Sequence, residues 1–443
     1  MPTETLMMKD SKIDWIGDIP DEWNIKKIKH ISNVHSSVRI FEDEYKDQGI
    51  PFFRTKEIVE LANNKEISLE LYISEDKYKT FRSKKVEKGD LLISSIGTIG
   101  EVWVCDGRDF WYKDGNITQI DKNDSFVSNY LKHLITSNIF MENIKFYEST
   151  TTISALTIEK IKEVKFPLPN LKEQQAIADF LDEKCEKIDK VISEIEEQIQ
   201  VLEDYKKSLI TETVTKGLDK NVPMKDSGID WIGKIPAKWE IKRIKYFTNL
   251  NGRIGWQGLT TEDYQDEGPF LITGVDFLNG SIDWNSCTHI TEKRWIEANT
   301  IQIKNDDLLI TKDGTVGKVA VVSGLNDKAS LNSGVLLIRP KGNVEYYNRY
   351  IYYQLISDVF WSWFEFNKSG NSTIIHLYQQ DFANLYTLLP NIAEQKQIAD
   401  YLDKECEKID ATISDKKEQL ETIKEYKKSL IYEYVTGKKR VAC

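Results

Sequence analysis

The chain has 443 residues, of which 40% are hydrophobic and 11% aromatic, so it is long enough for two or three domains and too apolar to be disordered. Its formal net charge of −11 argues against a protein that coats nucleic acid along its whole surface. Neither an apolar run of about 18 residues nor a secretory signal is present, so we expect a cytoplasmic protein with no membrane contact. Five cysteines without a C-x-x-C pair and five isolated histidines predict no metal site.

The chain opens with a segment that occurs twice. Residues 9–29 read KDSKIDWIGDIPDEWNIKKIK, and residues 225–245 read KDSGIDWIGKIPAKWEIKRIK. Their shared Trp, Ile and Pro predict a compact loop packed by aromatic rings against a neighbouring element. These residues are Trp15, Ile16, Pro20 and Trp23 in the first copy, and Trp231, Ile232, Pro236 and Trp239 in the second. Further matches follow at nearly the same spacing to the end of the sequence, so the duplication covers the entire chain.

A module of different texture follows each segment, at about residues 24–167 and 240–388. Short runs of branched and aromatic residues between Gly, Asn and Asp turns predict strands. They include residues 91–93, 102–104, 308–310 and 319–322. Residues 129–143 and 345–364 carry helical spacing of large apolar side chains, so each module is α+β. The modules have diverged strongly, which suggests that they bind different things.

One turn is shared by the two modules. SSIGTIGEVWV at 94–104 and TKDGTVGKVAVV at 311–322 both place G-T-x-G between two predicted strands. Such glycines allow a tight hairpin and the close approach of another backbone. A phosphate backbone held by exposed N–H groups and by Thr98 or Thr315 is one candidate. The alternative is a hairpin retained only for its turn geometry.

Side chains suited to DNA surround these turns, because Arg, Lys, Asn and Gln read base edges, and Thr and Ser hold phosphates. The candidate DNA-binding residues of the first module are Arg54, Thr55, Lys56, Thr98, Lys113 and Asn116, with Thr151 and Thr152 from a later loop. Those of the second are Arg253, Gln257, Lys312, Asp313, Thr315, Lys318, Asn332 and Ser333, with Asn371, Ser372 and Thr373 from the matching loop. Such residues occur on any surface, so none of them specifies the function singly.

A long helical stretch follows each module. Residues 168–215 and 389–436 align without a gap and are identical at more than half of the positions. Each stretch opens with Asn and a Glu three residues later, the spacing of a capping box, and closes near a glycine. These residues are Asn170, Glu173 and Gly217 in the first copy, and Asn391, Glu394 and Gly437 in the second.

Seven-residue apolar steps run along each stretch and predict a coiled-coil seam. In the first copy the seam residues are Leu181, Ile188, Ile195, Leu202 and Leu209, joined by Ile177, Val191 and Tyr205. The second copy keeps the phase but places Lys416 on the seam, so we expect looser or polar packing there. A helix of about 44 residues spans roughly 65 Å, too long for one wall of a globular core, which predicts a spacer paired with the other copy.

No catalytic constellation is present. The sequence contains no G-x-G-x-x-G, P-loop or H-E-x-x-H, and no Pro-Pro of the kind that amino-methyltransferases use to hold a target base. We therefore expect that the chain is not an enzyme.

The repeated order of segment, module and long helix resembles the specificity (S) subunit of type I restriction-modification systems. The helices begin LPNLKEQQAIADFLDEKCEKID and LPNIAEQKQIADYLDKECEKID. RIGWQGLTTEDY at 253–264, KDGTVG at 312–317 and HLYQQDF at 376–382 are similar to stretches common in the target-recognition domains of that family. The match covers almost the whole chain.

This resemblance implies an α+β fold in which two globular target-recognition domains are separated by two long helices that form an antiparallel coiled coil, with pseudo-twofold duplication. Residues 1–167 then hold the first segment and recognition domain, and residues 168–216 the first spacer helix. Residues 217–388 hold the second segment and domain, and residues 389–443 the second spacer helix. The end of the second helix would return towards residue 1.

The resemblance also implies a non-catalytic subunit. Each domain would read one half of a bipartite double-stranded DNA target, while the helices set the gap and dock two modification (methyltransferase) subunits. S-adenosylmethionine would sit on those subunits, and ATP and Mg on restriction or translocase subunits, so no cofactor is expected on this chain. A pseudo-twofold axis suits two identical partners. The alternative is a coiled-coil scaffold that carries two protein- or glycan-binding modules.

Overall fold

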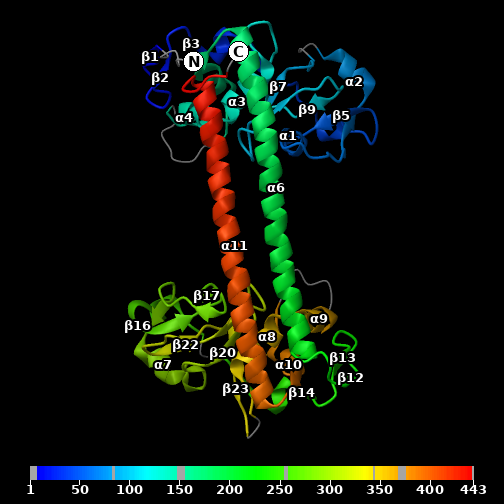
Figure 1. The fold of residues 1–443 in the computed structure, drawn as a ribbon, viewed down its shortest axis with the longest axis vertical. Coiled ribbons are helices and arrows are strands. Elements are labelled where there is room, and N and C mark those ends of the chain that lie inside the picture. The colour runs from blue at the N-terminus through cyan, green and yellow to red at the C-terminus, as the bar shows by residue number, and fades with distance from the viewer. Residues whose placement is uncertain are drawn as a thin grey trace. The chain divides into compact units, whose positions relative to one another are not determined.

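The computed structural model describes residues 7–81, 85–146, 155–253, 258–342, 345–367 and 376–441. The chain forms two compact units. Unit 1 consists of Met1–Glu196 and Glu418–Cys443, and unit 2 of Glu197–Lys417. The unit boundary passes through both long helices, so each unit holds one segment, one module, the start of one long helix and the end of the other (Figure 1).

The module of unit 1 is built on two small sheets. An antiparallel sheet has the order β4 (Val34–His35), β10 (Ile117–Ile120), β7 (Leu91–Ser94), β8 (Val102–Val104). A second sheet has the order β6 (Tyr72–Ile73), β5 (Ile50–Phe53), β9 (Trp111–Tyr112), with β5 and β9 parallel. The helices are α1 (Thr55–Ala62), α2 (Glu75–Thr80), α3 (Ser128–Thr136), α4 (Asn138–Phe146) and α5 (Ile158–Glu163), with 3-10 turns η1 (Ile28–His30) and η2 (Glu42–Glu44).

The module of unit 2 repeats this plan. Its four-stranded sheet has the order β15 (Thr248–Gly252), β23 (Val335–Pro340), β20 (Leu308–Thr311), β21 (Val319–Val321). Its three-stranded sheet has the order β19 (Thr288–Ile290), β16 (Tyr264–Ile272), β22 (Ala329–Leu331). The other elements are the pair β17 (Phe277–Leu278) and β18 (Ser281–Ile282), the helices α7 (Glu292–Glu297), α8 (Asn348–Ile356), α9 (Asp358–Asn367) and α10 (Gln379–Phe382), and the 3-10 turns η3 (Ile244–Tyr246), η5 (Thr261–Asp263) and η6 (Asn299–Ile301).

The strands of the two sheets correspond one to one between the modules, and the modules differ in the segment that follows the central strand of the three-stranded sheet and in the 3-10 turn η6 of unit 2. Where unit 1 has α1 after β5, unit 2 has the β17–β18 hairpin after β16. The predicted α+β class and the predicted strands are confirmed. In β7, Leu91 and Ile93 face the cluster of α3 and α4, and Leu92 faces the opposite cluster, as the period of two in a strand requires.

The two predicted helical stretches are each broken into two helices. In unit 1 the break is Ser137, with φ −78° and ψ 161°, and in unit 2 it is Ser357, with φ −81° and ψ 169°. Serine competes for backbone hydrogen bonds and so favours helix ends. The Ser357 hydroxyl accepts a hydrogen bond from the Val359 N–H at 3.3 Å and so starts the following helix.

Each repeated segment forms one strand pair within itself and a second pair with the strand that precedes a long helix. The pairs are β1 (Met8–Asp10) with β2 (Asp18–Pro20), β3 (Asn24–Lys27) with β11 (Lys165–Leu168), β12 (Met224–Asp226) with β13 (Lys234–Pro236), and β14 (Glu240–Arg243) with β24 (Tyr386–Leu389). Trp23 and Trp239 are fully buried, which confirms the predicted aromatic packing of these loops.

The long helices are α6 (Leu171–Lys216) and α11 (Ile392–Val435). Asn170 Oδ1 accepts the Glu173 N–H at 3.0 Å, and the second copy repeats this contact, so the predicted N-caps are confirmed. The capping-box glutamate has a different partner from the one predicted. Its carboxylate accepts the indole N–H of the buried tryptophan, Trp23 to Glu173 and Trp239 to Glu394, each at 3.0 Å.

The predicted seven-residue steps lie on the seam between the helices, but two of their companions do not. Val191 and Tyr205 are 41% and 56% exposed. The true companions follow four residues after each step, not three, because a coiled-coil seam alternates steps of four and three. The buried or half-buried companions on α6 are Cys185, Ile192, Ile199 and Lys206. On α11, Lys416 keeps the phase of the seam and is half-buried, so the seam is polar there as predicted.

Ion pairs across the seam show the direction of pairing in each unit. In unit 1, Asp189 pairs with Lys427 at 2.5 Å and Glu196 with Lys424 at 3.3 Å. The α6 number rises while the α11 number falls, so the helices are antiparallel. In unit 2, Lys206 with Asp410 at 2.6 Å and Glu203 with Lys417 at 3.4 Å give the same result. The predicted antiparallel coiled coil is confirmed.

The end of α11 returns to the beginning of the chain, as predicted. The Tyr432 hydroxyl donates to the carbonyls of Trp15 and Ile16 at 3.2 and 3.1 Å. Gly437, with φ +73°, lies so close to Pro20 that a Cβ atom would come within 2.4 Å of its ring. The first repeated segment therefore packs against the C-terminal end of α11. No helix in the described parts of the chain is both long and apolar enough to cross a membrane.

Candidate nucleic-acid interface

The G-T-x-G hairpin of each module is held by one hydroxyl. In unit 1 the Ser94 hydroxyl accepts the Glu101 N–H at 3.0 Å and donates to the Thr98 carbonyl. In unit 2 the Thr311 hydroxyl does the same with Lys318 N–H at 2.9 Å and with the Thr315 carbonyl. The two hairpins therefore share their internal geometry although their flanking sequences differ.

The two glycines of the hairpin have different surroundings, most clearly in unit 2. Gly97 and Gly314 have φ of +85° and +69°, and a Cβ atom there would meet nothing within 4 Å. Gly317, by contrast, lies against α9, where a Cβ atom would come within 2.7 Å of Trp361. One glycine thus serves packing, while the tip that carries an exposed Thr98 or Thr315 faces outward. The exposed tip is open to another backbone. In unit 1 the matching Gly100 is half-buried, and a Cβ atom there would lie 3.6 Å from Met141 Sδ, so close packing requires the second glycine only in unit 2.

In unit 1 the turn between β9 and β10 lies beside this hairpin. The Ser95 N–H donates to the Asn116 carbonyl at 2.8 Å, and Asn116 belongs to a turn that begins at the exposed Lys113. The Lys113 N–H donates to the carbonyl of Phe53, at the end of β5. Four candidates therefore share one edge of the module: Thr98, Asn116, Lys113 and Arg54, the residue that follows Phe53.

The charges of the α1 candidates are balanced within the module. Arg54 contacts Glu57 at 2.7 Å and Glu70 at 2.9 Å, and Lys56 contacts Glu70 at 3.3 Å. Hydrogen bonds to these carboxylates raise the pKa of Arg54, and hydrogen bonds from Arg54 and Lys56 lower the pKa of Glu70. The Thr55 hydroxyl is buried and has no hydrogen-bond partner among the described residues. This group therefore offers a phosphate less net positive charge than its sequence suggests.

Unit 2 assembles the same edge from different side chains. The Lys312 N–H donates to the Gly334 carbonyl at 2.8 Å, and the Lys312 carbonyl accepts the Leu377 N–H at 2.9 Å. The Asp313 carboxylate contacts the Nδ1 atom of the His376 ring. The edge gathers Lys312, Asp313, Thr315, Lys318, Asn332 and Ser333.

Two side-chain contacts shape this edge in unit 2. The Lys318 ammonium donates to the Gly274 carbonyl at 3.3 Å, so the half-buried Lys318 is anchored to the loop after β16. The Asn332 amide oxygen accepts from the Ser333 hydroxyl at 3.0 Å. Exposed Ser333 and Thr315 are left as the outermost hydroxyl-bearing side chains of the edge.

Arg253 lies inside the module and not on its surface. Its side chain is 6% exposed and donates to the Leu331 carbonyl at 2.7 Å and to the Ser330 hydroxyl at 3.1 Å. Burial lowers the pKa of its guanidinium. In this structure Arg253, which directly follows β15, joins the end of that strand to β22. The remaining candidates, Thr151, Thr152, Gln257, Asn371, Ser372 and Thr373, lie outside the described residues.

One surface residue that sequence reasoning missed is Arg39. It is exposed, and its guanidinium lies 5.5 Å from the centre of the Phe41 ring, which is itself 59% exposed. The neighbouring Val38 carbonyl accepts the Trp111 indole N–H at 3.2 Å, which places this loop beside the strand that leads to Lys113. The signal was an Arg-Ile pair that follows the first strand of the larger sheet in both copies, at 39–40 and 253–254.

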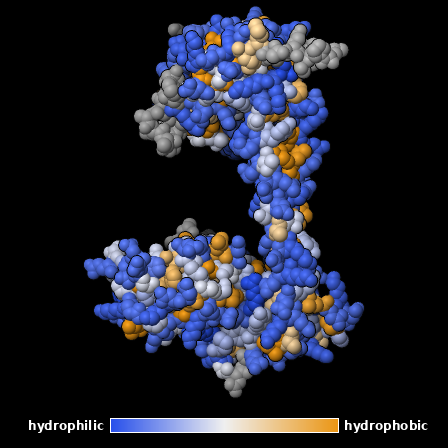
Figure 2. Space-filling model, turned by 60° about the vertical axis from the view of Figure 1, so that its left-hand side comes forward, coloured by the Kyte–Doolittle hydropathy of each residue, from blue (hydrophilic) through white to orange (hydrophobic). Residues whose placement is uncertain are grey.

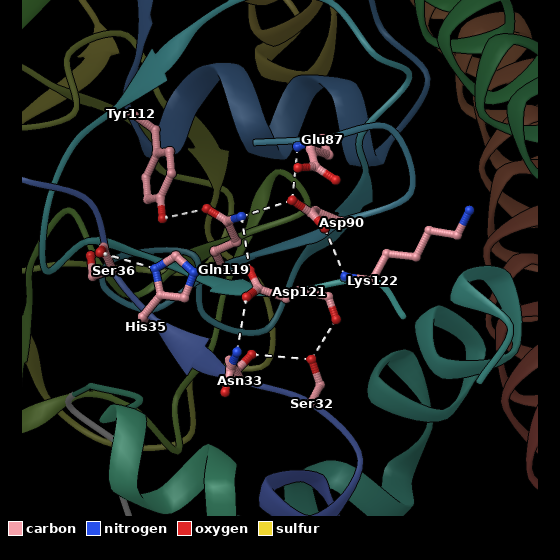
Figure 3. A network of polar contacts seen from close by, with 10 residues as sticks. All are labelled: Ser32, Asn33, His35, Ser36, Glu87, Asp90, Tyr112, Gln119, Asp121 and Lys122. Atoms are coloured by element: carbon pink, nitrogen blue, oxygen red, sulfur yellow. Dashed lines mark hydrogen bonds and ion pairs between the residues drawn. The ribbon is translucent and has the colours of Figure 1, made fainter. Parts of the chain in front are cut away.

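A buried polar network stiffens the unit 1 module behind this edge (Figure 3). The Gln119 amide donates to Asp90 at 2.8 Å and to Asp121 at 3.2 Å, and its oxygen accepts the Tyr112 hydroxyl at 3.0 Å. His35 contacts the same Asp121 carboxylate at 2.9 Å. Because each carboxylate accepts several hydrogen bonds, the network ties β4, β10 and β9 together without leaving a buried carboxylate unsatisfied.

A shallow groove opens at the end of β10 that lies away from the hairpin, and unit 2 has its counterpart. The unit 1 groove is lined by Lys29, Ser32, Asn33, Val34, His35, Ser36, Asp121 and Lys162. The unit 2 groove is lined by Lys245, Thr248, Asn249, Leu250, Lys341, Tyr378, Gln379, Gln380, Asp381 and Ala383. Lys29, Ser32, Asn33 and Val34 of the first groove correspond to Lys245, Thr248, Asn249 and Leu250 of the second, and the other lining residues differ. Within the described residues no cluster of His, Cys, Asp and Glu could hold a metal ion.

Comparisons with known proteins agree on one family. The family model described as "Type I restriction modification DNA specificity domain" matches residues 20–202 and 236–422. The type I restriction enzyme MjaIX specificity subunit of Methanocaldococcus jannaschii is 25% identical over 445 residues, which cover 96% of this chain and 95% of that protein. The EcoBI specificity subunit of Escherichia coli is 20% identical over 404 residues, covering 88% and 80%.

The fold has a match among solved structures. A chain from a study of complex assembly and conformational transition of the type I R-M system has a TM-score of 0.70 and 17% sequence identity. The alignment covers 95% of this chain and 99% of that chain. This likeness supports the fold of both modules and both long helices.

Proposed function

This chain belongs to the family of type I restriction-modification DNA specificity domains, and from that we propose that it is the DNA sequence-specificity subunit of such a system. Each module reads one half of a bipartite double-stranded DNA target. The long helices set the gap between the halves and dock the modification subunits. The duplication is the observation that carries the proposal, because the two modules share one fold and present different side chains at the corresponding edge.

The pattern of retention and divergence supports two readers of different sequence. Both modules retain the exposed hairpin tip. An exposed threonine beside accessible backbone suits a phosphate group, which is the same in every DNA sequence. The neighbouring positions differ, with Lys113 and Asn116 in one module against Asn332 and Ser333 in the other. Side chains that read base edges must differ if the two half-sites differ.

The partners and cofactors follow from this role. Two modification subunits that bind S-adenosylmethionine flank the chain, and restriction or translocase subunits that use ATP and Mg join them. The chain itself supplies no catalytic group and works in the cytoplasm. The family match in both modules favours DNA recognition over a scaffold for protein- or glycan-binding modules.

The test is sequence-specific methylation. The purified chain, the modification subunit of its own system and the two together are each incubated with genomic DNA and labelled S-adenosylmethionine. We expect methyl transfer only from the mixture, and sequencing of the products should give two short half-sites separated by a fixed gap. Turnover of S-adenosylmethionine by the chain alone would show that it is an enzyme, and methylation without a common sequence would show that it does not specify the target.

A further inference from the structure

The turn that follows the central strand of the three-stranded sheet corresponds between the two modules. In unit 1 the Phe53 carbonyl, at the end of β5, accepts the Lys113 N–H at 2.9 Å. In unit 2 the Ile272 carbonyl, at the end of β16, accepts the Asn332 N–H at 2.9 Å. These two contacts align Phe53 with Ile272, and therefore also align the four residues that follow each of them.

A carboxylate closes this four-residue turn in both modules. In unit 1, where the turn starts α1, the Arg54 N–H donates to the Glu57 carboxylate at 2.7 Å. In unit 2 the Thr273 N–H donates to the Asp276 carboxylate at 2.7 Å. The same carboxylate accepts the hydroxyls of Thr273 and Ser286, at 2.8 and 3.0 Å. Because Asp276 is buried and has three hydrogen bonds, the turn of unit 2 is rigid.

The third residue of the turn is Lys56 in the first module and Val275 in the second. Lys56 is half-exposed and contacts Glu70 at 3.3 Å. Val275 is 82% exposed, the highest value among the large apolar residues that the structure describes. Figure 2 shows apolar surface scattered over unit 2, so exposure alone does not single out this valine. Its distinction is that a rigid turn holds it in water at the position where the other module has a cation.

Val275 belongs to the same edge of the module as the shared hairpin. The carbonyl of the preceding Gly274 accepts the Lys318 ammonium at 3.3 Å. A Cβ atom on Gly274 would lie 3.3 Å from the methyl group of Thr311, whose hydroxyl holds the hairpin. The turn therefore lies beside the hairpin whose exposed tip carries Thr315.

The chemistry of valine limits what this side chain recognises on DNA. It has no charge and no hydrogen-bonding group, so it adds nothing to a phosphate contact. The apolar group on the base edges of the major groove is the methyl group of thymine. We infer that Val275 contacts a thymine methyl group in the second half-site, the one that residues 240–388 read, and so helps to specify an A·T pair. The inference rests on the proposed function, to which it adds a specificity-determining residue, a base and a groove.

The test removes the methyl group and the valine separately and then together. The full chain is assembled with the modification subunit of its system, and the second half-site is identified as the one that changes when residues 240–388 are exchanged. Duplexes then carry uracil in place of each thymine of that half-site in turn, on either strand, which removes one methyl group and no hydrogen bond. The wild-type complex should bind one of these duplexes about 4-fold more weakly than the thymine duplex, as expected for one buried methyl group.

The Val275→Ala complex should no longer distinguish thymine from uracil at that position, because the methyl group has lost its partner. Methylome sequencing of this variant should show a relaxed choice at that base pair and an unchanged first half-site. The matched control is Ile296→Ala, which removes a β-branched side chain that is 59% exposed. Ile296 lies on α7, whose Arg294 binds Asp263 at the opposite end of β16, so this control should keep the wild-type affinity and the uracil effect. Circular dichroism checks that both variants are folded.

Several outcomes would overturn the inference. A Val275→Ala complex that still binds the same uracil duplex about 4-fold more weakly would show that another residue reads the methyl group. A second half-site without an A·T pair, or equal binding of every uracil duplex by the wild-type complex, would show that no thymine methyl group is contacted. In each of these cases the complex still methylates one defined target, so the proposed function stands and the inference fails. Methylation without a common sequence by the wild-type complex would refute both.

Discussion

One flank of the coiled coil carries the ion pairs across the seam and allows a sharp test of which helix pairs with which. Glu196 and Glu203 lie on α6, and the equivalent positions on α11 are Lys417 and Lys424, so the sign of the charge is reversed between the copies. The observed pairs are Glu196 with Lys424 and Glu203 with Lys417. The contact is therefore attractive only between α6 and α11, and repulsive between two copies of either helix.

The perturbation is a charge-reversal cycle in the full chain. One double variant, Glu196→Lys with Glu203→Lys, replaces both attractive contacts by repulsive ones. A second, Lys417→Glu with Lys424→Glu, does the same with the opposite sign. The quadruple variant combines the two doubles and restores both pairs with their charges exchanged.

The magnitude follows from the exposure of these side chains, which lies between 38% and 59%. An exposed ion pair contributes about 0.2–1 kcal/mol, and a like-charge contact costs a similar amount. Two pairs lost and two repulsions gained should lower the free energy of unfolding by about 1–4 kcal/mol. For a unit of this size each kcal/mol lowers Tm by about 2–4 °C. The quadruple variant should return to within about 0.5 kcal/mol of wild type, since the pairs are restored.

The assay is thermal and urea unfolding followed by circular dichroism, at about 0.05 M and about 1 M NaCl, because the Debye length falls to about 3 Å at 1 M. The loss in the double variants should shrink at high salt. A control pair of substitutions, Glu186→Lys with Glu197→Lys, changes exposed charges on α6 that have no ion pair in the described part of the chain. A quadruple variant as unstable as either double variant would refute the pairing described here, as would double variants equal to wild type at low salt.

Three further predictions concern the spacer, the modules and the thiols. Removal of one heptad from each helix, residues 188–194 and 409–415, keeps the seam in phase. It should shorten the non-specific gap in the DNA target by up to about three base pairs, because a heptad is about 10 Å of helix. If methylome sequencing of a folded, partner-bound variant gave the parental gap, the helices would not set the gap length. Exchange of residues 240–388 for the module of a relative should change one half of the methylated sequence, and a change in both halves would contradict independent reading. Burial raises the pKa of Cys105 to about 11 and of Cys287 to about 12, so both should resist alkylation at pH 8 in the native chain and react in urea, as peptide mass mapping would show. Since these thiols ionise near pH 9 when unfolded, the free energy of unfolding should fall as the pH rises from about 9 towards 11, and rapid native labelling would refute their burial.

The sequence by itself determined the architecture, because its signals are local and repeated. Seven-residue steps, an N-cap asparagine and a closing glycine define each long helix without reference to the rest of the chain. The duplication suggested the antiparallel pairing, since two equal helices run in opposite directions when the twofold axis that relates them is perpendicular to their length, and the ion pairs across the seam show that direction. The strands around Leu91 and Leu308 were likewise visible as short apolar runs bounded by turns.

Details of the seam required the tertiary structure. A seven-residue step identifies one row of the seam, but the second row depends on which neighbour the partner helix covers. Val191 and Tyr205 looked like seam residues by spacing and lie on an exposed flank. Similarly, the capping glutamates bind buried tryptophans that are distant in sequence, a contact that no local pattern contains.

The candidate interface was the part that sequence determined least. From residue type alone, Arg54, Lys56 and Arg253 were predicted to contact DNA. In the structure Arg54 and Lys56 form ion pairs with Glu70, and Arg253 is buried. The same residue types, with Arg39 as an addition, become a surface only when strands distant in sequence end at one edge. Residue type fixes what a side chain is able to bind, whereas burial and charged neighbours, which are long-range properties of the fold, fix whether it is free to do so.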